Sequence, residues 1–170
     1  MSLTHTSFAT PLGEVCVAAH AQAVCGVWFA DAHRVPGRML ASPAAEAQAP
    51  EAMNPAAKLL EKTTQQINAY LAGERKTFDL PLDVSWATPF QQAVWRQLLG
   101  IAWGQTATYA DVARAMGKPQ AVRAVGMAIG RNPLSVLVPC HRVVGAQGQL
   151  TGYSGGLHRK QALLELESQR

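Results

Sequence analysis

The segment that decides the fold of this chain reads Pro139-Cys140-His141-Arg142-Val143-Val144-Gly145 and follows an apolar, strand-like run at residues 134–138. An isolated cysteine is most often a small buried hydrophobic residue. Cys140 differs because it follows a proline and adjoins a histidine and an arginine. Nearby proton acceptors and cations favour the thiolate, which is the nucleophilic form of cysteine. The segment therefore predicts a reactive thiol at Cys140.

Two short helices are predicted upstream of this segment. Thr108 stands three residues before Asp111, a spacing that resembles a capping box, and the helix that it begins continues to Gly117. After a turn at Lys118-Pro119, a second helix runs over residues 120–129. Two short helices joined by a tight turn are typical of the helix-turn-helix, a DNA-binding motif, although many helical hairpins share this outline.

Two further helices are predicted from a capping residue followed by proline, which suits the first helical position. Asn54-Pro55 begins a helix that ends near Ala72, with Gly73 after its end. Its apolar stripe consists of Leu59, Leu60, Ile67, Tyr70 and Leu71. Thr88-Pro89 begins a helix whose core-facing residues are Phe90, Val94, Trp95, Leu98 and Leu99.

The start of the chain has the pattern of a small sheet. Short β-type runs at 14–19 and 24–30 follow the turn signal Thr10-Pro11-Leu12-Gly13, and a Pro/Ala-rich loop is predicted at 34–51. We predict an α+β chain of two domains. Residues 1–86 form an α/β scaffold with a small antiparallel sheet and a helix, and residues 87–170 form a mainly helical, winged helix-turn-helix domain.

Charge separates the two halves. Residues 1–86 carry six basic and eight acidic side chains, a net charge of −2, whereas residues 87–170 carry nine basic and three acidic ones, a net charge of +6. The second half is therefore the candidate for binding a polyanion, although a solvated basic surface is the more common outcome of such an excess.

Composition narrows the class of protein. With 48% hydrophobic residues in 170, the chain can build a core, which excludes disorder. Three irregularly spaced cysteines do not form a disulfide framework and indicate a reducing compartment, so we expect the protein in the cytoplasm. The uncharged stretch at residues 15–30, which no other uncharged stretch of the chain exceeds in length, is too short and too polar for a membrane span, so we expect no membrane partner.

Four motifs in register resemble one family. Residues 139–144, together with Arg123-Ala124-Val125-Gly126, Asn132-Pro133 and Thr151-Gly152-Tyr153-Ser154-Gly155-Gly156, are similar in order and spacing to the O6-alkylguanine-DNA alkyltransferases, also called methylated-DNA–protein-cysteine methyltransferases. The resemblance runs from about Thr88 to Glu167. It implies a single-turnover DNA repair protein that flips the damaged base out of double-stranded DNA. The alkyl group passes from O6 of guanine, and more weakly from O4 of thymine, to the protein's own cysteine without a cofactor.

The same resemblance implies roles for single residues. Cys140 is the nucleophile, His141 takes its proton through a bound water, and Glu167 orients the imidazole. Asn132 joins the helix-turn-helix to the active-site turn by hydrogen bonds. Tyr109 assists the rotation of the nucleotide and protonates N3 of the leaving guanine.

The resemblance extends to the DNA-binding helix and the base pocket. Arg123 is implied to enter the duplex where the flipped base was. Its helix is implied to fit the narrow minor groove because the neighbouring residues Ala121, Ala124 and Gly126 are small. The base pocket is implied to contain the carbonyls of Cys140 and Val143, the facing Tyr153 and Ser154, and Ile129, where some relatives have methionine.

Some relatives hold a structural zinc ion in the first domain. His20 and Cys25 fall near two of those ligand positions, but no convincing set of four ligands exists among the candidates His5, Cys16, His20, Cys25 and His33. We therefore expect no metal.

Two other functions stay open. One is a non-catalytic winged-helix protein that binds alkylation damage, which Cys140 argues against because such proteins lack this thiol. The other is a Cys-His hydrolase, which the absence of a glycine motif of the oxyanion type before Cys140 makes a poor match. We expect a monomer in solution, with cooperative binding along DNA left open.

Overall fold

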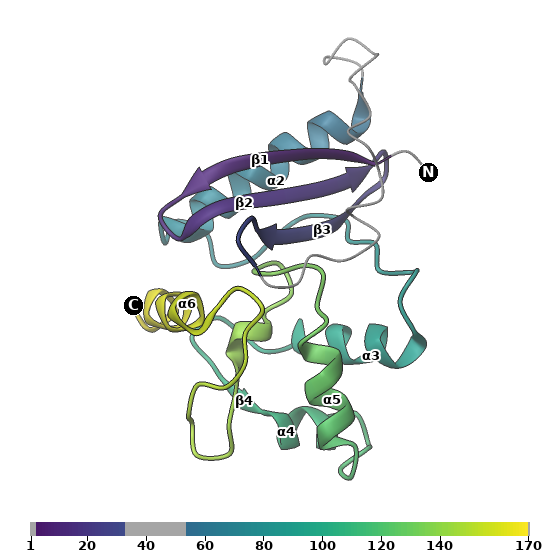
Figure 1. The fold of residues 1–170 in the computed structure, drawn as a ribbon, viewed down its shortest axis with the longest axis vertical. Helices are drawn as coiled ribbons and strands as arrows, with labels where there is room; N and C mark the ends of the chain where they lie inside the picture. Colours follow the sequence, from purple (N-terminus) through teal and green to yellow (C-terminus); the bar gives the residue numbers. More distant parts are fainter. Residues whose placement is uncertain (1–2, 33–53, 170) are drawn as a thin grey trace. The chain divides into compact units, whose positions relative to one another are not determined.

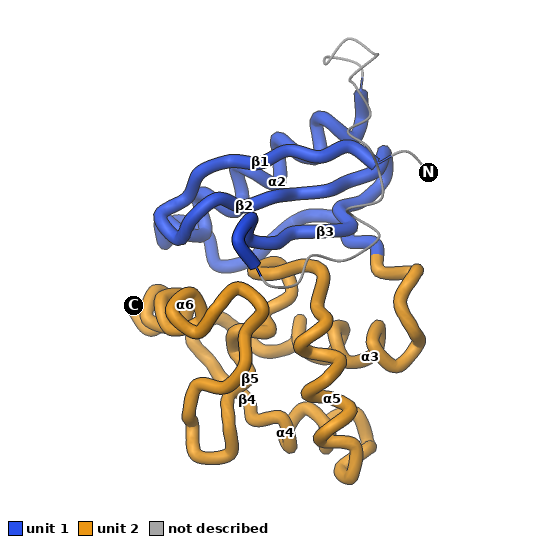
Figure 2. Tube along the Cα trace, viewed as in Figure 1, with its two compact units in different colours: residues 1–83 blue, residues 84–170 orange. Residues whose placement is uncertain are grey.

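The computed structural model describes residues 3–32 and 54–169, which belong to two compact units, residues 1–83 and 84–170 (Figure 2). The division falls three residues before the boundary predicted at 86/87. The loop predicted at 34–51 and His33 lie outside the described residues. No helix within the described ranges combines the length and the apolar character needed to cross a membrane.

The first unit is built on a three-stranded antiparallel sheet in the order β1-β2-β3, with strands β1 (Thr4–Thr10), β2 (Gly13–His20) and β3 (Ala23–Phe29) (Figure 1). Thr10 pairs with Gly13 across a tight turn. Gly13 has a φ of +114°, a backbone conformation that would be strained in a residue with a side chain. The sequence predicted β2 and β3 but not β1, whose residues are mostly polar and none fully buried.

Helix α2 (Pro55–Leu71) packs against this sheet and begins as predicted, with Asn54 accepting a hydrogen bond from the Ala56 N–H. Its predicted apolar stripe needs correction. Leu59 and Leu71 are only half-buried, whereas Thr63 and Gln66 are buried. The polar Gln66 fits the interior because its amide donates to and accepts from the backbone of Asp79.

The second unit contains four helices among its described residues, and a short parallel pair of strands. The helices are α3 (Pro89–Leu98), α4 (Tyr109–Ala115), α5 (Val122–Ile129) and α6 (Leu157–Ser168), and the strands are β4 (Ala107–Thr108) and β5 (Val143–Val144). Thr88 and Thr108 each complete a capping box at the start of α3 and α4. The predicted α+β class is confirmed, and α4 and α5 form the helix-turn-helix (Figure 1).

Three local predictions in this unit are wrong. Leu99 follows the end of α3 and is 52% exposed, so it does not face the core. Helix α5 begins at Val122, which leaves Ala121 as the residue before its first turn. The apolar run at 134–138 is a series of turns and not a strand, with Val136 at a φ of +71°. Its residues are mostly apolar because the turns are buried. A buried strand would produce the same pattern in the sequence.

Candidate active site

Cys140 begins a short 3₁₀ turn, η2 (Cys140–Arg142), which leads directly into β5. Its side chain is 4% exposed and lies in the wall of a cavity of about 190 Å³. The cavity is lined by Tyr109, Gly126, Ile129, Gly130, Cys140, Gly152, Tyr153 and Ser154. The structure thus places the thiol inside a small pocket, where a ligand can reach it without its being exposed on the surface.

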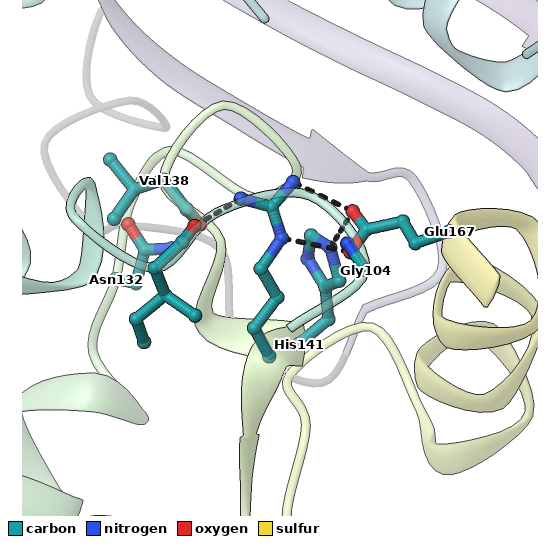
Figure 3. A network of polar contacts seen from close by, with 7 residues as sticks. Gly104, Asn132, Val138, His141 and Glu167 are labelled. Atoms are coloured by element: carbon teal, nitrogen blue, oxygen red, sulfur yellow. Dashed lines mark hydrogen bonds and ion pairs between the residues drawn. The ribbon is translucent and has the colours of Figure 1, made fainter. Parts of the chain in front are cut away.

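Asn132 holds the turns before Cys140 in place. Its Nδ2 donates to Cys140 Sγ at 3.1 Å and to the carbonyl of Val138 at 3.0 Å, and its Oδ1 accepts from the Leu134 N–H at 3.0 Å. Figure 3 shows Asn132 beside Val138. Because these partners replace the hydrogen bonds that a strand would make, one amide side chain satisfies a buried, irregular backbone.

His141 and Glu167 form a buried pair that joins η2 to the last turn of α6 (Figure 3). The distance from His141 Nε2 to Glu167 Oε1 is 2.8 Å, and both residues are at most 3% exposed. The carboxylate also accepts hydrogen bonds from Arg142, so it acts only as an acceptor here. The imidazole therefore donates from Nε2, which makes Nδ1 its basic nitrogen.

Arg142 has a role in the site that the sequence did not predict, where it was expected only as a cation near Cys140. Its Nε and Nη2 donate to the two oxygens of Glu167 at 2.8 Å each, and its Nη1 donates to the carbonyl of Ile101 at 2.5 Å. A bidentate pair of this kind fixes the carboxylate in one orientation. The Gly104 N–H lies 3.4 Å from Glu167 Oε2 on another side.

Burial shifts the proton equilibria of the two central groups in opposite directions. It raises the pKa of the Cys140 thiol above the usual 9.0, against the hydrogen bond from Asn132 and the positive charge of Lys160. It lowers the pKa of His141 below the usual 6.5, although Glu167 opposes this shift. At neutral pH the site therefore holds a thiol beside a neutral imidazole, which is able to accept a proton.

Lys160 is the second residue that the sequence analysis missed. Its side chain is fully buried, and its Nζ donates to the carbonyls of Val143 at 2.5 Å and Thr151 at 2.7 Å. It thereby joins β5 to the start of the loop that carries Tyr153 and Ser154. Its spacing from Glu167, with Leu163 between them on the same buried face of α6, is a signal that points to its position.

Tyr109 stands in the pocket wall at the start of α4. Its hydroxyl accepts a hydrogen bond from Thr151 Oγ1 at 3.1 Å, which connects α4 to the loop across the cavity. Gly126 faces this ring, since a Cβ built there would lie 3.6 Å from it, at ordinary van der Waals distance. Of the residues expected in the base pocket, Ile129, Tyr153 and Ser154 line the cavity.

Val143 does not line the cavity, in contrast to the sequence-based expectation. It is fully buried, and its carbonyl oxygen accepts the hydrogen bond from Lys160. The carbonyl of Cys140 accepts the backbone N–H of Val143. Each of the two carbonyls expected to meet a base thus already accepts at least one hydrogen bond within the protein.

Of the residues expected to contact DNA, Tyr109 begins α4, and the other four lie on α5 and just before it. Arg123 and Ala124 are exposed, Ala121 is half-buried, and Gly126 is the one of the four that lines the cavity. The face of the helix that carries Arg123 is therefore open to a partner, as a binding role requires.

Two of the five candidate metal ligands of the first unit contact other groups of the protein. His20 pairs with Asp83 at 3.0 Å, and Cys25 Sγ donates to the carbonyl of Ala18. Among the residues that the structure describes, no group of three or more His, Cys, Asp or Glu side chains is placed to hold a metal ion.

Comparisons with known proteins match both units. Residues 3–84 match the ribonuclease-like domain of 6-O-methylguanine DNA methyltransferase, and residues 89–169 match its DNA-binding domain. The methylated-DNA–protein-cysteine methyltransferase of Mycobacterium tuberculosis is 56% identical over 105 residues, which span 62% of this chain and 63% of that protein. The chain thus aligns with less than two thirds of that relative.

Two other comparisons cover nearly the whole chain. The methylated-DNA–protein-cysteine methyltransferase of Mycobacterium leprae is 42% identical over 161 residues, which span 95% of this chain and 90% of that protein. The solved structure of Mycobacterium tuberculosis OGT in complex with DNA has a TM-score of 0.79 and 37% identity, and the match covers 97% of this chain and 92% of that one. With both domain models matched in order and close similarity across the two units, the chain belongs to the methylated-DNA–protein-cysteine methyltransferase family.

Proposed function

We propose that this protein repairs DNA by transferring an alkyl group from O6 of guanine, and more weakly from O4 of thymine, to its own Cys140. The observation that carries the proposal is the position of Cys140 in the wall of a small cavity, with the aromatic residues Tyr109 and Tyr153 also in the lining. A nucleophile enclosed in this way suits a base that has left its stack. A damage-binding protein without chemistry needs no thiol there.

The chemistry is a displacement at the alkyl carbon. The bond between carbon and O6 breaks, a bond between carbon and Cys140 Sγ forms, and the electron pair of the broken bond stays with the guanine. His141 accepts the thiol proton at Nδ1 through a bridging water, while Glu167 holds the opposite nitrogen of the ring. Tyr109 protonates N3 of the departing guanine, and its hydroxyl is held at the pocket by Thr151.

Asn132 supports the sulfur during this step. Its Nδ2 lies 3.1 Å from Cys140 Sγ and donates to it, which favours the thiolate over the thiol. The positive charge of Lys160 acts in the same direction. These two residues oppose the cost of burying the anion.

The partner that we propose is double-stranded DNA containing O6-alkylguanine. The second unit carries the basic excess of the chain, and its exposed α5 presents Arg123 beside the pocket helix residues Gly126 and Ile129. The similar Mycobacterium tuberculosis protein has been solved in complex with DNA. Arg123 fills the place of the rotated base, and the small residues around it allow the helix to approach the minor groove.

We also propose that the protein acts as a monomer in the cytoplasm. All three cysteines are free, which suits a reducing compartment. Size-exclusion chromatography with and without DNA tests the monomer.

The test of the function is transfer of a radiolabelled methyl group from an O6-methylguanine oligonucleotide to the protein. We expect label on the wild-type chain and none on Cys140→Ala, with Cys16→Ala as the matched control that retains it. Binding of the oligonucleotide without any transfer would favour the damage-binding alternative. Repeated turnover of a chromogenic ester would instead reveal a hydrolase.

A further inference from the structure

Met127 is the most exposed large hydrophobic side chain of α5, with 55% of its surface open to solvent. Methionine is usually buried, and its flexible, polarizable side chain adapts well to an irregular partner. The proposed chemistry at Cys140 makes no use of it. An exposed methionine in the middle of a binding helix therefore needs its own explanation.

Its neighbours make Met127 stand out from the helix surface. Arg123 lies one turn before it, and Arg131 lies four residues after it, just beyond the end of α5; both are exposed. The exposed residues between them are small, namely Ala124 and Gly130. One apolar side chain thus projects between two cations from an otherwise flat surface.

The same helix forms part of the pocket. Gly126, Ile129 and Gly130 line the cavity that contains Cys140, and Met127 follows Gly126 directly. A base that enters the cavity stays attached to its strand on both sides. The strand must therefore cross the rim beside the pocket, where α5 presents Met127.

The charge of the helix-turn-helix indicates what covers this rim. Its exposed charged residues are Asp111, Arg114, Lys118, Arg123 and Arg131, of which four are basic and one is acidic. Asp111 is already paired with Arg114 at 2.9 Å. A basic surface with one projecting apolar group suits a partner that is a polyanion with an apolar interior. The minor groove of DNA has both properties.

We infer that Met127 is a second wedge, which packs against the sugars and base edges of the minor groove beside the extruded nucleotide while Arg123 fills the vacated stack. This inference rests on the proposed function, because it needs a flipped base in the pocket. The thioether supplies apolar contact without charge, so it adds affinity that salt does not screen.

The experiment measures binding of a duplex containing O6-methylguanine by fluorescence anisotropy, over a range of salt concentrations, with every variant made in Cys140→Ala chains. Met127→Ala should weaken binding about tenfold, as expected for removing a well-buried apolar side chain, and Met127→Leu should restore most of the loss. The slope of log K against log salt should stay unchanged for Met127→Ala. Arg123→Ala should instead reduce that slope by about 0.9.

Leu99→Ala is the matched control, because Leu99 is 52% exposed just after the end of α3 in the same unit and lies outside the helix-turn-helix. It should bind DNA as the parent does. Equal melting temperatures would show that all variants fold.

Two results would overturn the wedge. They are unchanged binding by Met127→Ala and an equal loss for Leu99→Ala. Methyl transfer by the Cys140-containing wild type is measured separately, so a failed wedge leaves the proposed function standing. A tenfold loss of binding for Met127→Ala without methyl transfer by the wild type would instead support the wedge and overturn the chemistry.

Discussion

Arg142 binds Glu167 through two parallel hydrogen bonds, from Nε to Oε2 and from Nη2 to Oε1, each 2.8 Å long. Glu167 Oε1 is also the oxygen that His141 Nε2 faces. The orientation of the proposed base therefore depends on a residue one step along the chain, acting through a carboxylate 25 residues away.

Arg142→Lys tests this dependence. A lysine ammonium is a single point of charge and cannot donate to both carboxylate oxygens and to the Ile101 carbonyl with the same geometry. We expect the methyl-transfer rate to fall about tenfold, with a loss of about 1–3 kcal/mol in the free energy of unfolding. Quenched time courses of methyl transfer measure the rate, and urea titrations measure the free energy of unfolding. An unchanged rate in a destabilised protein would show that Arg142 acts on folding alone.

The pH dependence of the alkylation of Cys140 follows from the raised pKa of its thiol. Burial raises the pKa of the thiol above 9.0, so the rate with free O6-benzylguanine should continue to increase as the pH rises from 7 past 9. A plateau reached below pH 7 would contradict a thiol that rests in its protonated form.

Stability should depend on pH through His141. Its pKa is lowered in the folded protein, so the unfolded chain binds a proton first as the pH falls through about 6.5. The contribution of His141 to stability is therefore fully present above this pH. It decreases below this pH until His141 is protonated in the folded protein as well. Melting temperatures across this range should fall less steeply for His141→Gln than for the wild type, and equal slopes would contradict the assignment.

Lys160→Met should affect both the loop and the thiol. It leaves the carbonyls of Val143 and Thr151 without their buried donor, at a cost of about 1–3 kcal/mol. It also removes a positive charge that lowers the pKa of Cys140, so alkylation should slow more at pH 7 than above pH 9. Lys58→Met, which changes an exposed lysine of the first unit, serves as the control. A uniform loss at all pH values would indicate a structural role alone.

Arg123→Ala should slow repair of duplex DNA far more than the reaction with free O6-benzylguanine, because the free base needs no rotation. Unstacking a base costs a few kcal/mol, so the rate on the duplex should fall by roughly one to two orders of magnitude. Arg96→Ala, an exposed arginine on α3, is the matched control. Equal losses on both substrates would place Arg123 in folding or in the pocket.

The protein should be consumed in the reaction, since a thioether has no acyl carbon for water to attack. Titration with excess methylated oligonucleotide should repair about one lesion per active molecule. Mass analysis should find the methyl group on Cys140 and not on Cys25, whose pKa burial raises to about 11, nor on Cys16. Methyl groups on either of the other cysteines, or several turnovers, would disprove this mechanism.

Local signals in the sequence predicted local structure well. Asn54-Pro55 and Thr88-Pro89 start α2 and α3, and the Thr108–Asp111 capping box starts α4, because a cap depends on residues within one turn. The run at 134–138 was predicted to be a strand, and this prediction was wrong because a local pattern does not show where the hydrogen bonds go. Its partner is the side chain of Asn132, and an apolar pattern does not reveal whether hydrogen bonds go to a neighbouring strand or to one amide.

The sequence by itself determined the class of the fold, the helix-turn-helix and the family motifs around Cys140, since these depend on residues close together in the chain. Only the tertiary structure decided which distant groups meet at the site. Lys160 reaches Val143 across 17 residues, Thr151 reaches Tyr109 across 42, and Arg142 reaches Ile101 across 41. Such contacts depend on how α6 and the loop before it pack around η2 and β5. Packing of this kind follows from burial summed over many residues, and no short pattern in the sequence encodes it.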